Sequence, residues 1–99
     1  MKLDYNSIFG NSPKYVKRDR ARRILKPKSV MILDIIDNSG SDGIKARELA
    51  DKSQQTSGYC LSTIDGINKR IDGLIISIGP RRQRKYIVRW NIKELATNE

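Results

Sequence analysis

The chain contains no histidine and a single cysteine, Cys60, among its 99 residues. One cysteine cannot form an internal disulfide. Without histidine, the chain offers neither a Cys/His metal site nor a Ser-His or Cys-His catalytic pair. Cys60 falls on an apolar stripe at helical spacing, so we interpret it as a packed thiol of the core. We therefore expect no metal and no cofactor.

Other signs of an enzyme are also missing. The chain has no glycine-rich phosphate loop of the GxxxxGKS type. Asp34 and Asp37 stand three positions apart, but their spacing is that of the polar side of an amphipathic helix, and Asp42 falls in a predicted turn. We expect a protein that is not an enzyme, and no separate domain for a small-molecule ligand.

Long hydrophobic runs are absent from the sequence. No stretch reaches the ~18 consecutive apolar residues of a membrane-spanning helix. The first nine residues include Lys2, Asp4 and Asn6, and they lack the apolar run of a secretion signal. These absences, together with the lone cysteine, predict a cytoplasmic protein with no membrane partner.

Positive charge is what the chain has in excess, with 20 Lys and Arg against 11 Asp and Glu and a net charge of +9. Residues 14–28 hold eight cations and one anion, and residues 81–89 hold five cations and no anion. Two such concentrated patches favour a polyanionic partner. Aromatic residues are only 6% of the chain, and Tyr15 and Tyr59 are the only candidates for stacking on single-stranded bases. Double-stranded DNA is therefore the favoured partner.

Apolar periodicity predicts a compact series of elements after residue 26. Pro27 suits the first position of a helix that ends near Asn38. The following elements are a short strand at 43–45, a helix at 46–52, a polar turn at 53–58, a helix at 59–72 with Gly73 just after it, and strand-like segments at 74–78 and 86–90. The two strand-like segments flank a basic turn, residues 79–85.

This order of elements resembles the winged helix-turn-helix family. The resemblance covers roughly residues 27–91 and depends on the segment 43–50, the stripe Ile64-Ile67-Ile71, the junction 72–75 and the hairpin that ends at Trp90. It implies an α+β fold, a three-helix core with a C-terminal β-hairpin wing. It also implies a third helix in the DNA major groove and a wing on the backbone or minor groove. One departure is a turn between the second and third helices that looks about three residues longer than is common.

The ends of the chain are harder to interpret. Residues 1–26 form either a basic N-terminal arm, mobile without DNA, or a short helix over 14–26. Residues 92–99 form a C-terminal tail, and capping-box spacing at 91–94 predicts a short helix near 92–96. Apolar residues at both ends of the chain need something to pack against, which favours a homodimer. They are Leu3, Tyr5, Ile8, Phe9, Ile92 and Leu95.

Candidate DNA contacts come from three segments. On the third helix, Cys60, Ile64 and Ile67 point inward, and the opposite face offers short polar groups, a glycine and cations. The candidates on this helix are Tyr59, Ser62, Gly66, Lys69 and Arg70; those in the wing are Arg81, Arg82, Arg84 and Lys85; and those in the basic segment are Lys17, Arg18, Arg20, Arg22 and Arg23.

Each candidate has a plainer interpretation. Any amphipathic helix has a solvated polar face, and we expect Asp65 to hold Lys69 by an ion pair four positions apart. Cations at hairpin tips also block edge-to-edge pairing of strands, but one or two suffice for that, and here there are four. The basic segment can be simply a solvated tail.

We therefore expect a double-stranded DNA-binding protein, a sequence-specific transcriptional regulator located at nucleoid or host-cell DNA. One alternative is a replication, partition or architectural DNA binder with weak sequence preference. The other is a winged helix that docks on an acidic protein partner, because a fold alone does not decide function.

Overall fold

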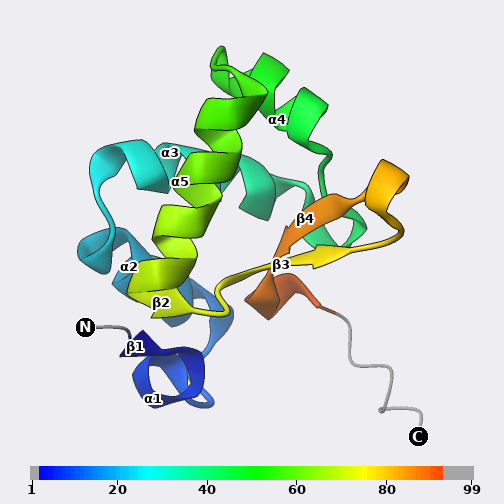
Figure 1. Cartoon of the computed structure of the whole chain (residues 1–99). Coiled ribbons are helices and arrows are strands. Elements are labelled where there is room, and N and C mark those ends of the chain that lie inside the picture. The colour runs from blue at the N-terminus through cyan, green and yellow to red at the C-terminus, as the bar shows by residue number, and fades with distance from the viewer. Residues whose placement is uncertain (1–2, 93–99) are drawn as a thin grey trace, which may run out of the picture.

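The structure, a computed structural model, describes residues 3–92. Within that range the chain forms five α-helices and two small sheets (Figure 1). The helices are α1 (Tyr5–Phe9), α2 (Lys14–Ile24), α3 (Pro27–Asn38), α4 (Ala46–Ser53) and α5 (Ser57–Arg70). The strands are β1 (Leu3–Asp4), β2 (Ile71–Asp72), β3 (Ile75–Ile78) and β4 (Lys85–Val88). Short 3-10 turns lie at Gly40–Asp42, Arg81–Gln83 and Arg89–Asn91.

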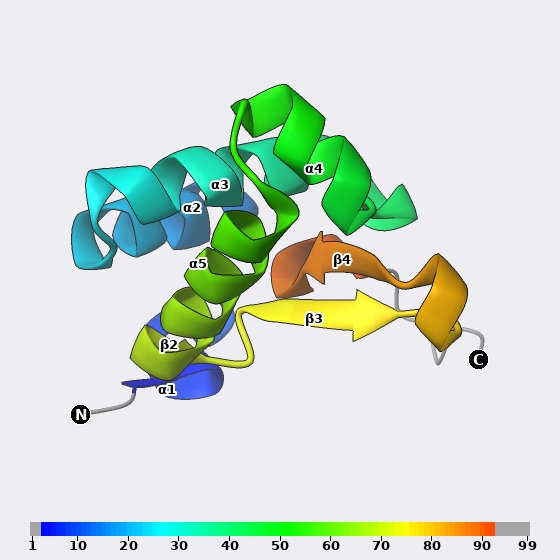
Figure 2. The ribbon, with the colours of Figure 1, turned by 45° about the horizontal axis from the view of Figure 1, so that its top comes forward.

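Helices α3, α4 and α5 pack around the apolar stripes that the sequence predicts. Pro27 stands at the start of α3, where its missing N–H costs nothing, and Leu33 and Ile36 of this helix are fully buried. Helix α5 buries Cys60 and Ile67 against them. Figure 2 shows these three helices gathered on one side of the β3–β4 hairpin. The fold is thus a small α+β structure whose hairpin is compatible with a winged helix.

The hairpin has the position that the sequence predicts. Strands β3 and β4 pair antiparallel, from Ile75 opposite Val88 to Ile78 opposite Lys85. The predicted strand at 43–45 is reduced to one bridge, in which Ile44 pairs with Tyr86. Gly79 opens the turn at a φ of +86°, a conformation that L side chains rarely adopt.

The connection between α4 and α5 is shorter than the sequence indicates. Ser53 still belongs to α4 and α5 begins at Ser57, so only residues 54–56 lie between the helices. Gln54 takes the left-handed conformation at φ 58°, and its N–H bonds to carbonyls of α4. The Thr56 hydroxyl accepts the Tyr59 amide at 3.0 Å, which starts α5 two residues early. The prediction of a long turn between these helices is therefore wrong, and so is the departure from the family pattern that was based on it.

Helix α5 also ends earlier than predicted. It stops at Arg70, and Ile71 and Asp72 leave the helix to pair in parallel with Leu3 and Asp4. Local periodicity assigns Ile71 and Asp72 to the helix, but pairing with β1 places them in a strand. Gly73, expected directly after the helix, lies instead in the turn that follows β2, at φ +75°.

The N-terminal residues belong to the core. Tyr5 and Phe9 are buried, and their ring centroids lie 4.9 Å apart. The ring centroids of Phe9 and Trp90 lie 6.0 Å apart. Residues 14–24 form the helix that was one of the two predicted possibilities, and Ala21 and Leu25 are buried against the other helices. The core therefore extends beyond the expected 27–91 domain.

This packing changes the argument for a homodimer. Tyr5 and Phe9 are buried within the chain and Ile8 packs against the core, so they need no second copy. Ile92 remains 40% exposed. Leu95, like most of the short helix predicted near 92–96, lies outside the described residues.

Candidate nucleic-acid interface

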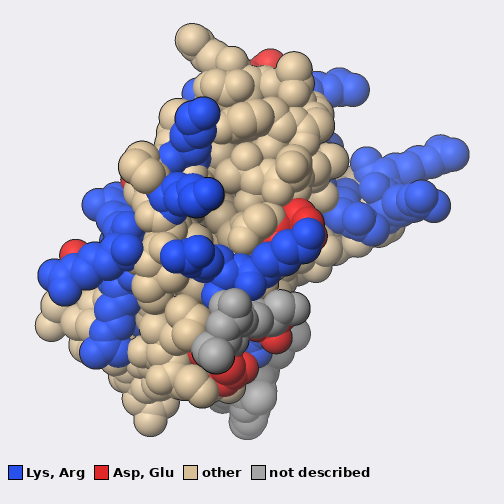
Figure 3. Space-filling model, turned by 60° about the vertical axis from the view of Figure 1, so that its left-hand side comes forward, with Lys and Arg blue, Asp and Glu red and all other residues tan. Residues whose placement is uncertain are grey.

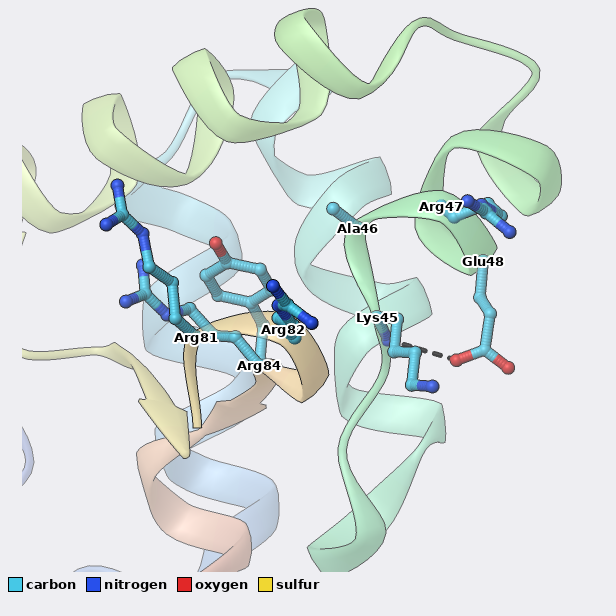
Figure 4. Close-up of a pocket in the computed structure, with 8 residues that line it drawn as sticks. Lys45, Ala46, Arg47, Glu48, Arg81, Arg82 and Arg84 are labelled. Atoms are coloured by element: carbon cyan, nitrogen blue, oxygen red, sulfur yellow. Dashed lines mark hydrogen bonds between the residues drawn. The ribbon is translucent and has the colours of Figure 1, made fainter. Parts of the chain in front are cut away.

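The hairpin tip, residues 79–85, projects toward the start of α4. Between the two lies a hollow of about 670 Å³ lined by five cations, Lys45, Arg47, Arg81, Arg82 and Arg84, together with Ala46, Glu48 and Tyr86. Figure 4 shows the three arginines of the tip on one side and Arg47 and Glu48 on the other. The hollow takes its shape from the sheet, because the bridge from Ile44 to Tyr86 ties the residue before Lys45 to the hairpin.

The charges around this hollow are not neutralised. Within residues 3–92, the side chains of Arg81, Arg82 and Arg84 form no hydrogen bond or ion pair, and the same holds for Lys45 and Arg47. The one carboxylate in the lining, that of Glu48, accepts the backbone N–H of Lys45 at 3.0 Å and so caps α4. The tip therefore presents exposed positive charge with no compensating acid bound to it.

The outer face of α5 carries the helix residues that the sequence predicts. Ser62, Gly66, Lys69 and Arg70 are exposed and Tyr59 is half-buried. The expected ion pair between Lys69 and Asp65 is present at 3.2 Å. Figure 3 shows Lys and Arg side chains spread over the face that includes this side of the molecule, with a further basic cluster projecting from its edge.

Gly66 has no packing role inside the protein. A Cβ added there would meet nothing within 4 Å. It lines two shallow hollows between α5 and the start of α3, of about 410 and 580 Å³. The absence of a side chain keeps this part of the helix backbone open to an approaching molecule.

The predicted cations of α2 differ from those of the tip, because every one of them has a partner within the chain. Lys17 lies over the Tyr5 ring at 5.5 Å, Arg18 pairs with Asp37, Arg20 donates to the Ile8 carbonyl at 2.6 Å, Arg22 pairs with Asp34 at 2.9 Å and Arg23 pairs with Asp19 at 3.1 Å. Their contact with DNA stays a prediction. These interactions hold α2 in place against α1 and α3.

Asp37 is the centre of this internal network. Its carboxylate accepts hydrogen bonds from Arg18 of α2, from Trp90 Nε1 at 2.8 Å and from Asn91 Nδ2 at 2.8 Å. Burial alone would raise the pKa of Asp37, but these hydrogen bonds and the Arg18 charge outweigh it and hold the pKa below its ordinary value. Interpreting Asp37 as part of a solvated polar face was therefore wrong, since the residue is only 7% exposed.

Four cations that the fold places beside the predicted contacts were not among those contacts, although Lys26 and Lys28 belong to the basic segment 14–28. Lys45 and Arg47 line the hollow at the hairpin tip, and Lys26 and Lys28 lie beside Gly66. The signal for the first pair was their position around the start of a predicted helix that follows a predicted strand. No local pattern in the sequence shows that this start faces a hairpin tip nearly 40 residues later.

The described residues contain no group of three or more His, Cys, Asp or Glu side chains that could hold a metal ion. Cys60 is buried, and its sulfur lies 3.4 Å from the Ser53 hydroxyl, as expected for a packed thiol. None of the helices in residues 3–92 is long and apolar enough to cross a bilayer.

The fold and the basic surface define a class, a small α+β protein with a cationic hairpin tip. Comparison with known proteins adds no more specific identity: no protein-family model, no curated protein and no solved structure matches the chain.

Proposed function

We propose that this chain is a small winged helix that binds double-stranded DNA. In this proposal α5 enters the major groove and the hairpin tip, acting as the wing, lies on the backbone or in the minor groove. The observation that carries the proposal is the hollow at the hairpin tip, where five cations have no acidic partner within the described chain. Unpaired guanidinium and ammonium groups bind phosphate oxygens through charge-assisted hydrogen bonds and release counterions from DNA as they do so.

The dimensions of α5 are consistent with this role. An α-helix with its side chains is about 10–12 Å wide and the major groove is about 12 Å wide, so one helix fills it. The exposed Ser62 provides a short donor and acceptor for base edges, and Lys69 and Arg70 provide cations. We propose that these helix residues select the sequence and that the tip supplies affinity, as a sequence-specific transcriptional regulator requires.

The first experiment is selection of bound sequences from a random pool of duplex DNA, followed by affinity measurements from 50 to 200 mM salt. With roughly six phosphate contacts, we expect affinity to fall by about a thousandfold over that range. An affinity that barely changes with salt contradicts electrostatic binding to DNA.

The same selection separates the two DNA-binding roles. A regulator yields a defined consensus, whereas a replication, partition or architectural protein with weak preference yields none. A winged helix that docks on an acidic protein gives a third result, binding an acidic polypeptide such as polyglutamate at least as tightly as a duplex of equal charge.

Pairing of two copies remains a separate prediction, based on the twofold sites that such proteins commonly use. It implies half-sites about one helical turn apart. Mass measurement at micromolar concentration tests it. A monomer of 11.3 kDa both with and without the selected duplex contradicts pairing and leaves the DNA-binding proposal intact.

A further inference from the structure

A second cationic surface lies on the opposite side of α5 from the hairpin. We call it the α3–α5 groove; its polar and open residues are Lys26, Lys28, Ser29, Gly66, Lys69 and Arg70. Figures 1 and 2 both show the start of α3 on one side of α5 and the β3–β4 hairpin on the other. The surface thus flanks the helix that we place in the major groove.

The chemistry of this groove is that of an anion site. No carboxylate lines either of its two hollows. Lys26 and Lys28 are exposed, and neither ammonium group has a partner within residues 3–92. The backbone amides of Lys28 and Ser29 also have no acceptor in that range, because the helical ladder of α3 begins with the Val30 amide bonding to the Lys26 carbonyl. Within the described residues, the unpaired cations Lys26 and Lys28 at the start of α3 and Arg70 at the end of α5 thus line two neighbouring hollows, together with Lys69, which is paired with Asp65.

A helix that fills the major groove has one phosphate backbone on each side. The hairpin tip lies on the other side of α5 from the α3–α5 groove. We propose that the α3–α5 groove holds the phosphates of the other strand, so that the protein grips the duplex from both edges of the major groove. This inference rests on the proposed function and adds a DNA contact by Lys26 and Lys28, which lie outside the third helix and the wing.

Gly66 fits this assignment. It lies between the two hollows, and an added Cβ would project into open space rather than against the protein. A side chain there would occupy the volume that a phosphate and its sugar need. The unoccupied position thus favours close approach of a strand to the α5 backbone.

The test uses the full chain, the duplex obtained by selection, and the variants Lys26→Gln and Lys28→Gln, separately and together. Lys14→Gln is the matched control, because Lys14 is also exposed and unpaired within the described range. It lies at the start of α2, whereas the groove follows the end of that helix, roughly 15 Å away along the helix axis. We expect each groove variant to lower the slope of log affinity against log salt by about one unit, and the pair by about two. We expect the control to change the slope by less than half as much.

Hydroxyl-radical footprinting of each strand identifies what is gripped. We expect the double groove variant to lose protection on the strand at one edge of the major groove, and Arg82→Gln to lose it on the other strand. Groove variants that behave like Lys14→Gln, or that lose the same phosphates as Arg82→Gln, overturn the inference.

Failure of this inference is distinguishable from failure of the proposed function. A wild-type protein that binds no duplex contradicts both. If the wild-type protein binds the duplex, and Arg82→Gln lowers affinity and salt slope but the groove variants do not, only the contact of the α3–α5 groove with the other strand is contradicted.

Discussion

Helix α2 and the hairpin tip are equally rich in positive charge but use it differently. In α2, the cations Arg18 and Arg22 reach carboxylates of the neighbouring helix α3, and Arg20 reaches a backbone carbonyl. At the tip, Arg82 and Arg84 have no partner within residues 3–92. Charge density alone therefore does not identify a binding surface; what identifies it is charge that the fold leaves without a partner.

The difference arises from what lies opposite each segment. Helix α2 packs beside α3, which presents Asp34 and Asp37 to it. The tip extends away from the core, and the only carboxylate in its hollow, that of Glu48, is bound to a backbone amide. A partnered cation resists a second anion because its own ion pair must be weakened first, whereas an exposed unpaired one gives up only water and counterions.

The largest expected effect comes from removing the charge of the tip. With Arg81, Arg82 and Arg84 all replaced by Gln, we expect the affinity for duplex DNA to fall roughly a thousandfold and the salt slope to fall by about three units. The free energy of unfolding should change by less than about 0.5 kcal/mol, because these side chains are exposed and unpaired within the described residues. Fluorescence anisotropy and urea unfolding measure the two quantities.

The matched control replaces Arg18, Arg20 and Arg22 of α2 by Gln. We expect the reverse pattern, a lowered stability with a much smaller change in salt slope, since these arginines bind the protein itself. Equal losses of DNA affinity in the two triple variants would remove the distinction between the regions.

Asp37 is the next strongest test. Asp37→Ala leaves the Arg18 guanidinium, the Trp90 N–H and the Asn91 amide without their acceptor. We expect a loss of about 3 kcal/mol in the free energy of unfolding. Asp34→Ala, which removes a more exposed ion pair, should cost less than about 1 kcal/mol. Similar costs in chemical denaturation would show that Asp37 is not the centre of the network.

Acid should separate the two regions as well. Because the folded-state pKa of Asp37 lies below its ordinary value of 3.8, its contribution to stability is complete above about pH 4 and is lost as the pH falls through the lowered pKa. The hairpin tip, residues 79–85, contains no carboxylate. We expect the wild-type protein to lose more stability than Asp37→Asn between pH 7 and pH 3. Parallel losses in both proteins would assign the acid sensitivity elsewhere.

The smallest expected effect concerns Gly66. Gly66→Ala should raise the free energy of unfolding by about 0.5–1 kcal/mol, because a helical glycine is replaced at a position where the new Cβ meets nothing within 4 Å. We expect DNA affinity to fall at the same time. A variant that is more stable and binds as well as the wild type would show that no strand approaches α5 at this point.

Much of the fold was predictable because its signals are local. The stripe of Cys60, Ile64 and Ile67 and the pattern of the β3–β4 hairpin both follow from residues close together in the chain. That the basic segment forms an ordered helix, α2, was not predictable in this way. Ala21 is the one buried residue of this helix, and the place of α2 depends on contacts to α1 and α3.

The site was predictable in part for the same reason. The four cations of the tip lie within five positions of the sequence, so the basic cluster is visible without the structure. The outer face of α5 follows from helical geometry. The role of Asp37 depends on partners 19, 53 and 54 positions away. That Lys45 and Arg82 line the same hollow likewise depends on tertiary structure, because the bridge between Ile44 and Tyr86 brings their segments together.

The parallel pairing of β1 with β2 has a kinetic consequence. Leu3 pairs with Ile71, a residue far along the chain that directly follows α5. Closing so long a loop is slow and entropically costly compared with forming the helices and the hairpin, whose contacts are between near neighbours. We therefore expect the first strand to dock in a late step of folding. On the ribosome, Leu3 emerges well before Ile71, so it reaches its native position only after this partner has been made.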